Sequence, residues 1–71
     1  DGYRVYIEAP TSAELYVDGA YVGIIPTDFA KKEGTHIISL RKDGCQTRSY
    51  TLEIDDTKKD VRYSFSDLVS K

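Results

Sequence analysis

The chain has 71 residues, a formal net charge of -2 and a single cysteine. This length makes one small domain, and a lone cysteine excludes an internal disulfide, so the apolar core must hold the fold alone. The Lys and Arg residues are scattered among Asp and Glu, which argues against nucleic-acid binding because that needs several cations on one face. No apolar run approaches the roughly 20 residues that span a bilayer, so no membrane insertion of this segment is expected.

The first third of the chain predicts a strand and then a hairpin. Residues 3–8 alternate between apolar and polar side chains, and so do residues 13–17 after a break at Pro10. Asp18-Gly19 supplies the positive φ angles of a tight turn, so residues 21–24 should pair back antiparallel. The side chains expected to face the core are Tyr3, Val5, Ile7, Ala13, Leu15 and Val17.

Two residues shape the end of this hairpin. Gly23 inside a strand predicts a bulge or a close approach of the backbone. Pro26 ends the strand, because proline has no amide hydrogen to donate. We interpret residues 27–33 as either an irregular connection or a short edge strand with Phe29 as its anchor, since the segment is too short for a stable helix.

The remaining segments repeat the same pattern. Gly34 opens a strand with His36, Ile38 and Leu40 on one face, and Asp43-Gly44 forms the next turn. Two further strands are expected before and after a polar loop at residues 55–60, with Leu68 tucked behind the last one. Their inward side chains are Tyr50, Leu52, Ile54, Val61, Tyr63 and Phe65. Six or seven short strands at this spacing predict an all-β fold, a small antiparallel β-sandwich.

No catalytic, metal or cofactor site is predicted. A catalytic cysteine needs a base and a group that orients the base, and we expect His36 to be a half-exposed strand residue and Cys45 a buried, inert thiol. The acidic loop with Asp55, Asp56 and Asp60 has no glycine and carries two lysines between its carboxylates. We therefore interpret it as a solvated turn rather than a calcium site.

The six tyrosines divide between the two faces of the strands. Tyr3, Tyr50 and Tyr63 fall on inward faces, whereas Tyr6 and the pair Tyr16 and Tyr21 fall on outward ones. An exposed tyrosine pair can stack on sugars or anchor a protein partner, and it can also simply stabilise the sheet by cross-strand packing. Tyr16 and Tyr21 are the candidate contact surface.

In this order and spacing, the motifs resemble the PEGA domain, a small bacterial and archaeal β-module. Pro10-Thr11-Ser12-Ala13 stands at the position of the motif that names the family, with Pro and Ala retained and the middle pair changed. The family hairpin is represented by Leu15-Tyr16-Val17-Asp18-Gly19, and the strand exit by Val22-Gly23-Ile24-Ile25-Pro26. Gly34-Thr35-His36 matches the start of the next strand, and Gly44-Cys45 stands where the family has Gly-Tyr. The resemblance runs from about Arg4 to Phe65.

The resemblance implies a sandwich of the transthyretin-like or carboxypeptidase-regulatory-like kind, without catalytic residues. It makes Gly19, Gly23, Pro26, Gly34 and Gly44 structural turn residues. Such modules occur on exported or membrane-anchored multidomain proteins, so residues 1–71 are expected to be one domain of a longer extracytoplasmic protein. The expected function is that of a spacer or protein-contact module, with neighbouring domains or other cell-envelope proteins as partners. The alternative is a glycan-binding module that uses the outward tyrosines on a polysaccharide.

Overall fold

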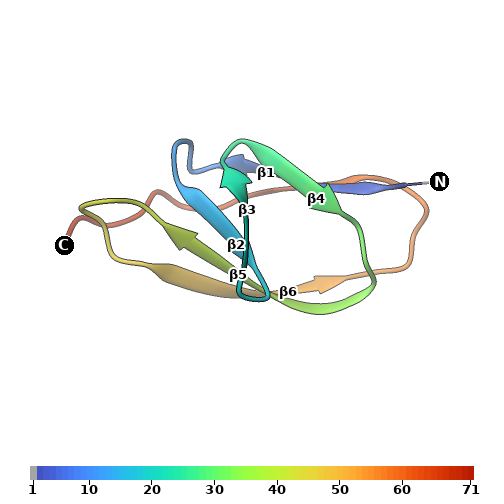
Figure 1. Ribbon diagram of the computed structural model, residues 1–71. Helices are drawn as coiled ribbons and strands as arrows, with labels where there is room; N and C mark the ends of the chain where they lie inside the picture. The colour runs from blue at the N-terminus through green and yellow to red at the C-terminus, as the bar shows by residue number, and fades with distance from the viewer. Residues whose placement is uncertain (1) are drawn as a thin grey trace.

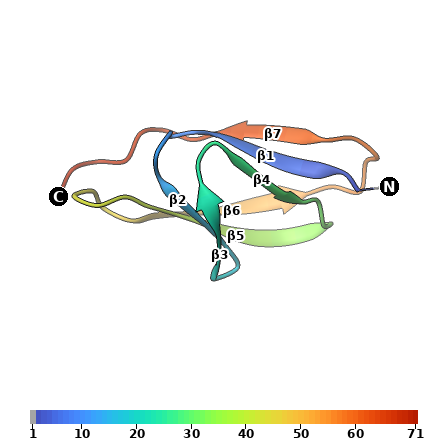
Figure 2. The same ribbon diagram turned by 45° about the horizontal axis from the view of Figure 1, so that its top comes forward.

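The computed structural model describes residues 2–71, which form seven β-strands and no helix. The strands are β1 (Arg4–Ala9), β2 (Glu14–Val17), β3 (Ala20–Ile24), β4 (Thr27–Ala30), β5 (Gly34–Arg41), β6 (Arg48–Ile54) and β7 (Val61–Ser64). They make a three-stranded sheet in the order β4-β1-β7 and a four-stranded sheet in the order β3-β2-β5-β6. The two sheets lie one over the other (Figures 1 and 2). The predicted all-β sandwich is confirmed.

The predicted hairpin joins β2 to β3. Asp18 and Gly19 have φ angles of 52° and 86°, and a two-residue turn that matches the twist of its strands needs positive φ at both positions. The pairing of β2 with β3 shifts register beside Gly23, which is the expected bulge. A Cβ atom at Gly23 would lie 3.3 Å from Oγ1 of Thr27, so the backbone also approaches its neighbour closely there.

The chain crosses from the four-stranded to the three-stranded sheet at Pro26. Of the two interpretations of the segment that follows, the edge strand is correct: β4 lies at the border of its sheet, with Phe29 half-buried against the core. Gly34 and Gly44 have φ angles of 125° and 81°, which side chains rarely adopt. Both glycines therefore hold the turn positions predicted for them, one at the start of β5 and one after its end.

Both sheets contain strands that come from distant parts of the chain. β1 pairs antiparallel with β4 and parallel with β7, although β7 lies more than fifty residues later in the sequence. β5 pairs antiparallel with both β2 and β6. Because β1, β2 and β5 have neighbours on both sides, their inward side chains form the centre of the core.

The core consists of aliphatic side chains from both sheets and the crossing segment. The fully buried members are Val5, Ile7, Ala13, Leu15, Ile25, Ile38, Leu40 and Ile54. Two predictions about inward residues were wrong. Tyr3 is 39% exposed because it precedes β1, where the two sheets no longer cover it. Cys45 is only half-buried, because it lies in an isolated bridge with Ser70 rather than in a strand of either sheet.

The sandwich is elongated, measuring 40 × 19 × 19 Å along its principal axes. The first described residues and the last ones lie at opposite ends of the long axis (Figures 1 and 2). We call the end formed by residues 2–3, 31–33 and 55–60 the N-terminal pole. The end formed by residues 42–47 and 66–71 is the C-terminal pole.

Candidate contact surfaces

The structure brings the predicted contact residues Tyr16 and Tyr21 together. They are cross-strand partners in the β2–β3 hairpin, and their ring centroids lie 5.5 Å apart with an interplanar angle of 62°. This is the edge-to-face arrangement that aromatic rings prefer when they pack on each other. Tyr21 is 57% exposed, whereas Tyr16 is half-buried between its neighbours. The two rings therefore do not form one flat platform.

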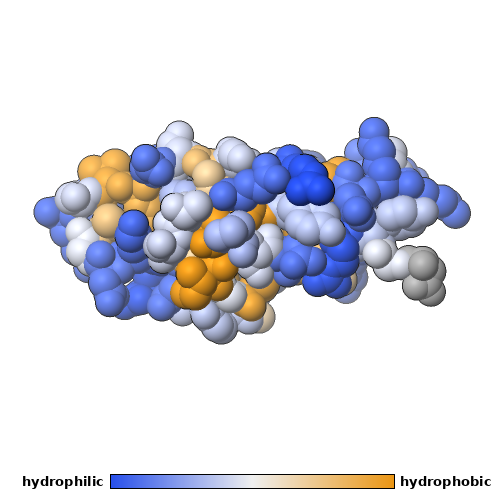
Figure 3. All heavy atoms as spheres, turned by 90° about the horizontal axis from the view of Figure 1, so that it is seen from above, coloured by the Kyte–Doolittle hydropathy of each residue, from blue (hydrophilic) through white to orange (hydrophobic). Residues whose placement is uncertain are grey.

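The outer face of the four-stranded sheet carries further apolar side chains around this pair. Ile24 and Ile37 are 49% and 44% exposed, and both point away from the core because Ile25 and Ile38 beside them are buried. Figure 3, which views the molecule from the side of β1 and β4, shows an apolar strip in the middle of the molecule. Exposed apolar groups that gather in this way are typical of contact surfaces.

A hydrogen-bonded His36–Asp18 pair ties the hairpin turn to β5. Nδ1 of His36 lies 2.7 Å from Oδ2 of Asp18, and Nε2 lies 2.8 Å from the carbonyl oxygen of Lys32. The carbonyl oxygen and the carboxylate are both acceptors, and only the protonated imidazole can donate to both of them. The hydrogen bond that His36 makes to Asp18, followed by the one to the carbonyl oxygen of Lys32, raises the pKa of His36 above 6.5. The same pair, together with the amide of Ile37, lowers the pKa of Asp18 below 3.8.

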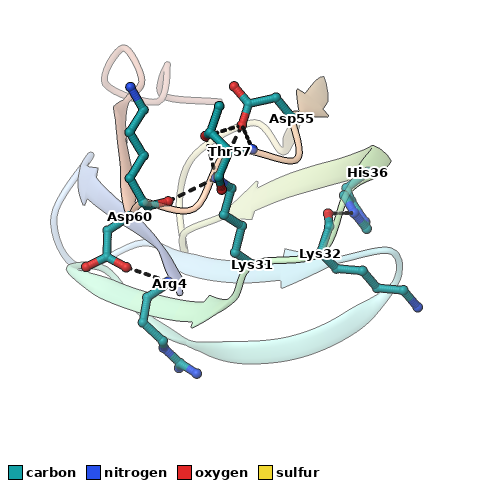
Figure 4. Close-up of polar contacts among 8 residues, drawn as sticks. Arg4, Lys31, Lys32, His36, Asp55, Thr57 and Asp60 are labelled. Carbon is teal, nitrogen blue, oxygen red and sulfur yellow. Dashed lines mark hydrogen bonds and ion pairs between the residues drawn. The ribbon is translucent and has the colours of Figure 1, made fainter. Parts of the chain in front are cut away.

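The side chain of Lys31 closes the N-terminal pole. Its Nζ donates to the carbonyl oxygens of Thr57 and Lys59 at 2.6 and 2.9 Å and to Oγ1 of Thr57 at 2.9 Å. It also lies 3.2 Å from Oδ1 of Asp55, and its side chain is only 5% exposed. Figure 4 shows Lys31 reaching from the end of β4 into the 55–60 loop. One ammonium group thus holds a loop that the sequence presented as a solvated turn.

Two further contacts fix the same loop. The backbone amide of Arg4 donates to Oδ1 of Asp60 at 2.8 Å, as Figure 4 also shows. Oδ1 of Asp55 accepts from the hydroxyl and amide of Thr57 at 2.6 and 3.1 Å. These two bonds, followed by the Lys31 contact, lower the pKa of Asp55 to about 2. Asp55 and Asp60 therefore serve as acceptors for side chains and amides of this chain.

The C-terminal pole is fixed by backbone pairing. The amide of Gln46 donates to the carbonyl oxygen of Val69 at 2.7 Å, and the amide of Lys71 donates to that of Gly44 at 3.0 Å. The last residues thus run antiparallel to the turn that follows β5. Both ends of the sandwich are therefore anchored to the body of the domain.

The outer face of the three-stranded sheet carries a second, charged surface around Tyr6. Its two cross-strand neighbours are Asp28 on β4 and Arg62 on β7. The guanidinium carbon of Arg62 lies 4.4 Å from the centre of the Tyr6 ring, a cation–π contact. Arg62 also pairs with Glu8 at 3.1 Å, and Arg4 pairs with Asp28 at 2.7 Å. The sequence placed Tyr6 outward, but its charged neighbours became visible only with the strand register.

The one histidine and the one cysteine lie near opposite ends of β5. His36 uses both ring nitrogens on Asp18 and Lys32, at the start of β5. Cys45 lies in the turn beyond the other end of that strand. No group of three or more His, Cys, Asp or Glu side chains that could hold a metal ion occurs within the same residues.

Seven short strands in two packed sheets define a small β-sandwich. The model of the PEGA domain family matches residues 2–66. The chain therefore belongs to the PEGA domain family, whose members are small accessory domains not known to be catalytic. No curated protein matches the chain. Residues 2–71 hold no helix with the length and apolar character needed to cross a membrane.

Proposed function

We propose that this PEGA domain is a non-catalytic spacer that holds neighbouring domains of an exported or membrane-anchored bacterial protein apart. The observation that carries the proposal is the elongated shape. The chain enters at one end of a body 40 Å long and leaves at the other (Figure 1). A domain of this shape sets a fixed distance between whatever precedes and follows it.

The clamps at both poles support this function. A spacer transmits orientation only if its first and last residues are held by the folded body. Lys31 and Asp60 hold the N-terminal pole through the 55–60 loop, and Gln46 holds the C-terminal segment through Val69. The exposed faces around Tyr21 and Tyr6 are then free to contact cell-envelope proteins beside the spacer. An extracytoplasmic location is part of this proposal.

The test is a distance distribution between spin labels at the two ends. Labels are placed by Gly2→Cys and Lys71→Cys in a Cys45→Ser background, since a Cβ at Gly2 meets no atom within 4 Å. A flexible Gly/Ser chain of the same length spans about 45 Å on average, so the width of the distribution decides. A narrow distribution for the domain, beside a broad one for the Gly/Ser control, is expected. An equally broad distribution for the folded domain would contradict the spacer.

Glycan binding through the tyrosines is the second candidate, supported by the 57% exposure of Tyr21. The angle of 62° between the two rings leaves one ring, rather than two, to lie flat against a sugar. A saturable affinity of the unmodified domain for a polysaccharide, lost on Tyr21→Ala, would favour this function over the spacer.

A further inference from the structure

Within residues 2–71, four strands lie at sheet borders, and β6 is the longest of them. It has no bulge or proline, and its charged residues Arg48 and Glu53 lie near its two ends. Natural sheets blunt their borders with bulges, prolines or short strands, because free backbone groups there recruit other strands. β3 contains the bulge at Gly23, β4 has four residues and follows Pro26, and β7 also has four residues. β6 has seven residues without Gly or Pro, and it pairs with β5 without a register shift.

The register shows which backbone groups of β6 are free. The amide of Ile37 donates to Oδ1 of Asp18 at 2.9 Å, and its carbonyl accepts from the Asp18 amide at 2.8 Å. Both groups therefore point toward β2. In an antiparallel pair, two opposite residues point their backbone groups either toward each other or away from each other. The groups of Ile37 point away from β6, and Thr51 is its partner. The amide and carbonyl of Thr51 therefore point away from β5, toward the open border. Ser49 and Glu53 do likewise, and within residues 2–71 these groups have no backbone partner.

Apolar side chains are incompletely covered along the same border. Ile38 and Leu40 of β5 are fully buried, whereas Tyr50 and Leu52 of β6 are only half-buried. Phe65 stacks on Tyr50 with a centroid distance of 4.6 Å, and no strand lies beyond it on the side of β6. An occupant of this border must therefore be an extended segment with apolar side chains at alternate positions.

We propose that the occupant is a second copy of this chain, with the two β6 strands antiparallel about a two-fold axis at Thr51. In this register Thr51 faces the partner's Thr51, and Ser49 faces the partner's Glu53. Each of these outward-pointing pairs exchanges two backbone hydrogen bonds, as narrow antiparallel pairs do. The three free positions of β6 are all satisfied, and the four-stranded sheet continues into its copy.

The side chains of β6 are complementary to themselves in this register. On the inner face Tyr50 lies opposite the partner's Leu52, so the half-buried apolar groups cover each other. On the outer face two threonines meet on the axis, a favourable cross-strand pair. No like charges lie opposite each other, and Arg48 at the start of the strand comes beside the partner's Asp55, which follows the end of β6.

Pairing along a single strand buries less surface than a standard interface, so the dimer is weak and forms at high concentration. This inference does not depend on the spacer function. A high effective concentration of the domain strengthens such a weak contact. Because the two β6 strands are antiparallel, the two domains of the dimer lie side by side and run in opposite directions.

The test is sedimentation velocity of the full chain from micromolar to millimolar concentration. The wild type is expected to shift from the monomer toward the dimer coefficient as concentration rises. Thr51→Lys and Thr51→Glu each place like charges on the axis and should remain monomeric, whereas their equimolar mixture should associate again. Thr51→Val, which keeps the free amide, is the matched control and should behave as the wild type.

Thermal unfolding of each variant verifies that it is folded, which is expected because the Thr51 side chain is exposed. A wild type that stays monomeric over the whole range would overturn the proposal. So would association of Thr51→Lys alone that equals that of the wild type, or a mixture that does not associate. If the wild type stays monomeric but gives a narrow distribution of distances between the two spin labels, the dimer proposal fails and the spacer proposal stands.

Discussion

Replacing Lys31 by methionine tests whether one buried ammonium group holds the N-terminal pole. The change keeps a long unbranched side chain and removes the three donors that bind Thr57 and Lys59. Hydrogen bonds to charged groups contribute about 1.5–3 kcal/mol each. The loop oxygens lie near the surface and regain water, so we expect a total loss of about 2 kcal/mol rather than the sum of three bonds.

That loss is large for this chain, because a 71-residue domain has a free energy of unfolding of roughly 4–10 kcal/mol. For a domain of this size it lowers Tm by about 8–16 °C. Urea unfolding gives the free energy, and amide hydrogen exchange locates the effect. Exchange should accelerate in residues 55–60, which the Lys31 side chain holds (Figure 4).

The matched control is Lys58→Met, which makes the same chemical change on an exposed side chain of the same loop. It should leave the free energy of unfolding within about 0.5 kcal/mol of that of the wild type. If Lys31→Met were no more destabilising than Lys58→Met, and hydrogen exchange in residues 55–60 were unchanged, this prediction would be refuted. The contact of Lys31 with the loop would then not stabilise the fold.

Three further predictions concern the hairpin and its surroundings. Gly19→Val should lower the free energy of unfolding by more than about 1 kcal/mol, because a β-branched residue is strained at positive φ. Gly19→Asn should be tolerated better. Equal urea midpoints for the two variants would contradict this prediction. Replacing both Tyr16 and Tyr21 by alanine should lower it by roughly 0.5–2 kcal/mol, the scale of a cross-strand aromatic pair, and an unchanged Tm would mean that the rings do not pack. The pKa of His36 is raised in the folded protein. Its pair with Asp18 therefore stabilises the fold fully below pH 6.5, and this stabilisation is lost as pH rises through the folded pKa. His36→Gln should abolish that part of the pH dependence. A wild-type stability that does not fall above pH 6.5 would show that the pair is not charged.

Much of the fold followed from local patterns. The alternation in β1, β2, β5 and β6 identified the buried residues correctly, because side chains of a strand point to opposite faces in turn. The turn at Asp18-Gly19 was likewise predictable, since few residues adopt positive φ. The family assignment confirmed the resemblance carried by these motifs over residues 2–66.

The candidate surfaces were predictable only in part. The pairing of Tyr16 with Tyr21 followed from the hairpin, because a short turn fixes the register of its two strands. The contacts of Tyr6 did not follow, since its neighbours on β4 and β7 come from distant parts of the chain. The placement of Tyr3 was wrong because alternation gives the face of a residue but not where its sheet ends.

By itself, therefore, the sequence determined the strands, the tight turns and the inward side of most strands, all of which depend on neighbours a few residues apart. The tertiary structure alone decided that β7 runs parallel to β1, that Lys31 closes the N-terminal pole and that β6 keeps a free border. These features depend on strand order and register between segments far apart in the chain. Several arrangements of the same strands satisfy the local alternation, and only packing of both sheets around one core selects among them.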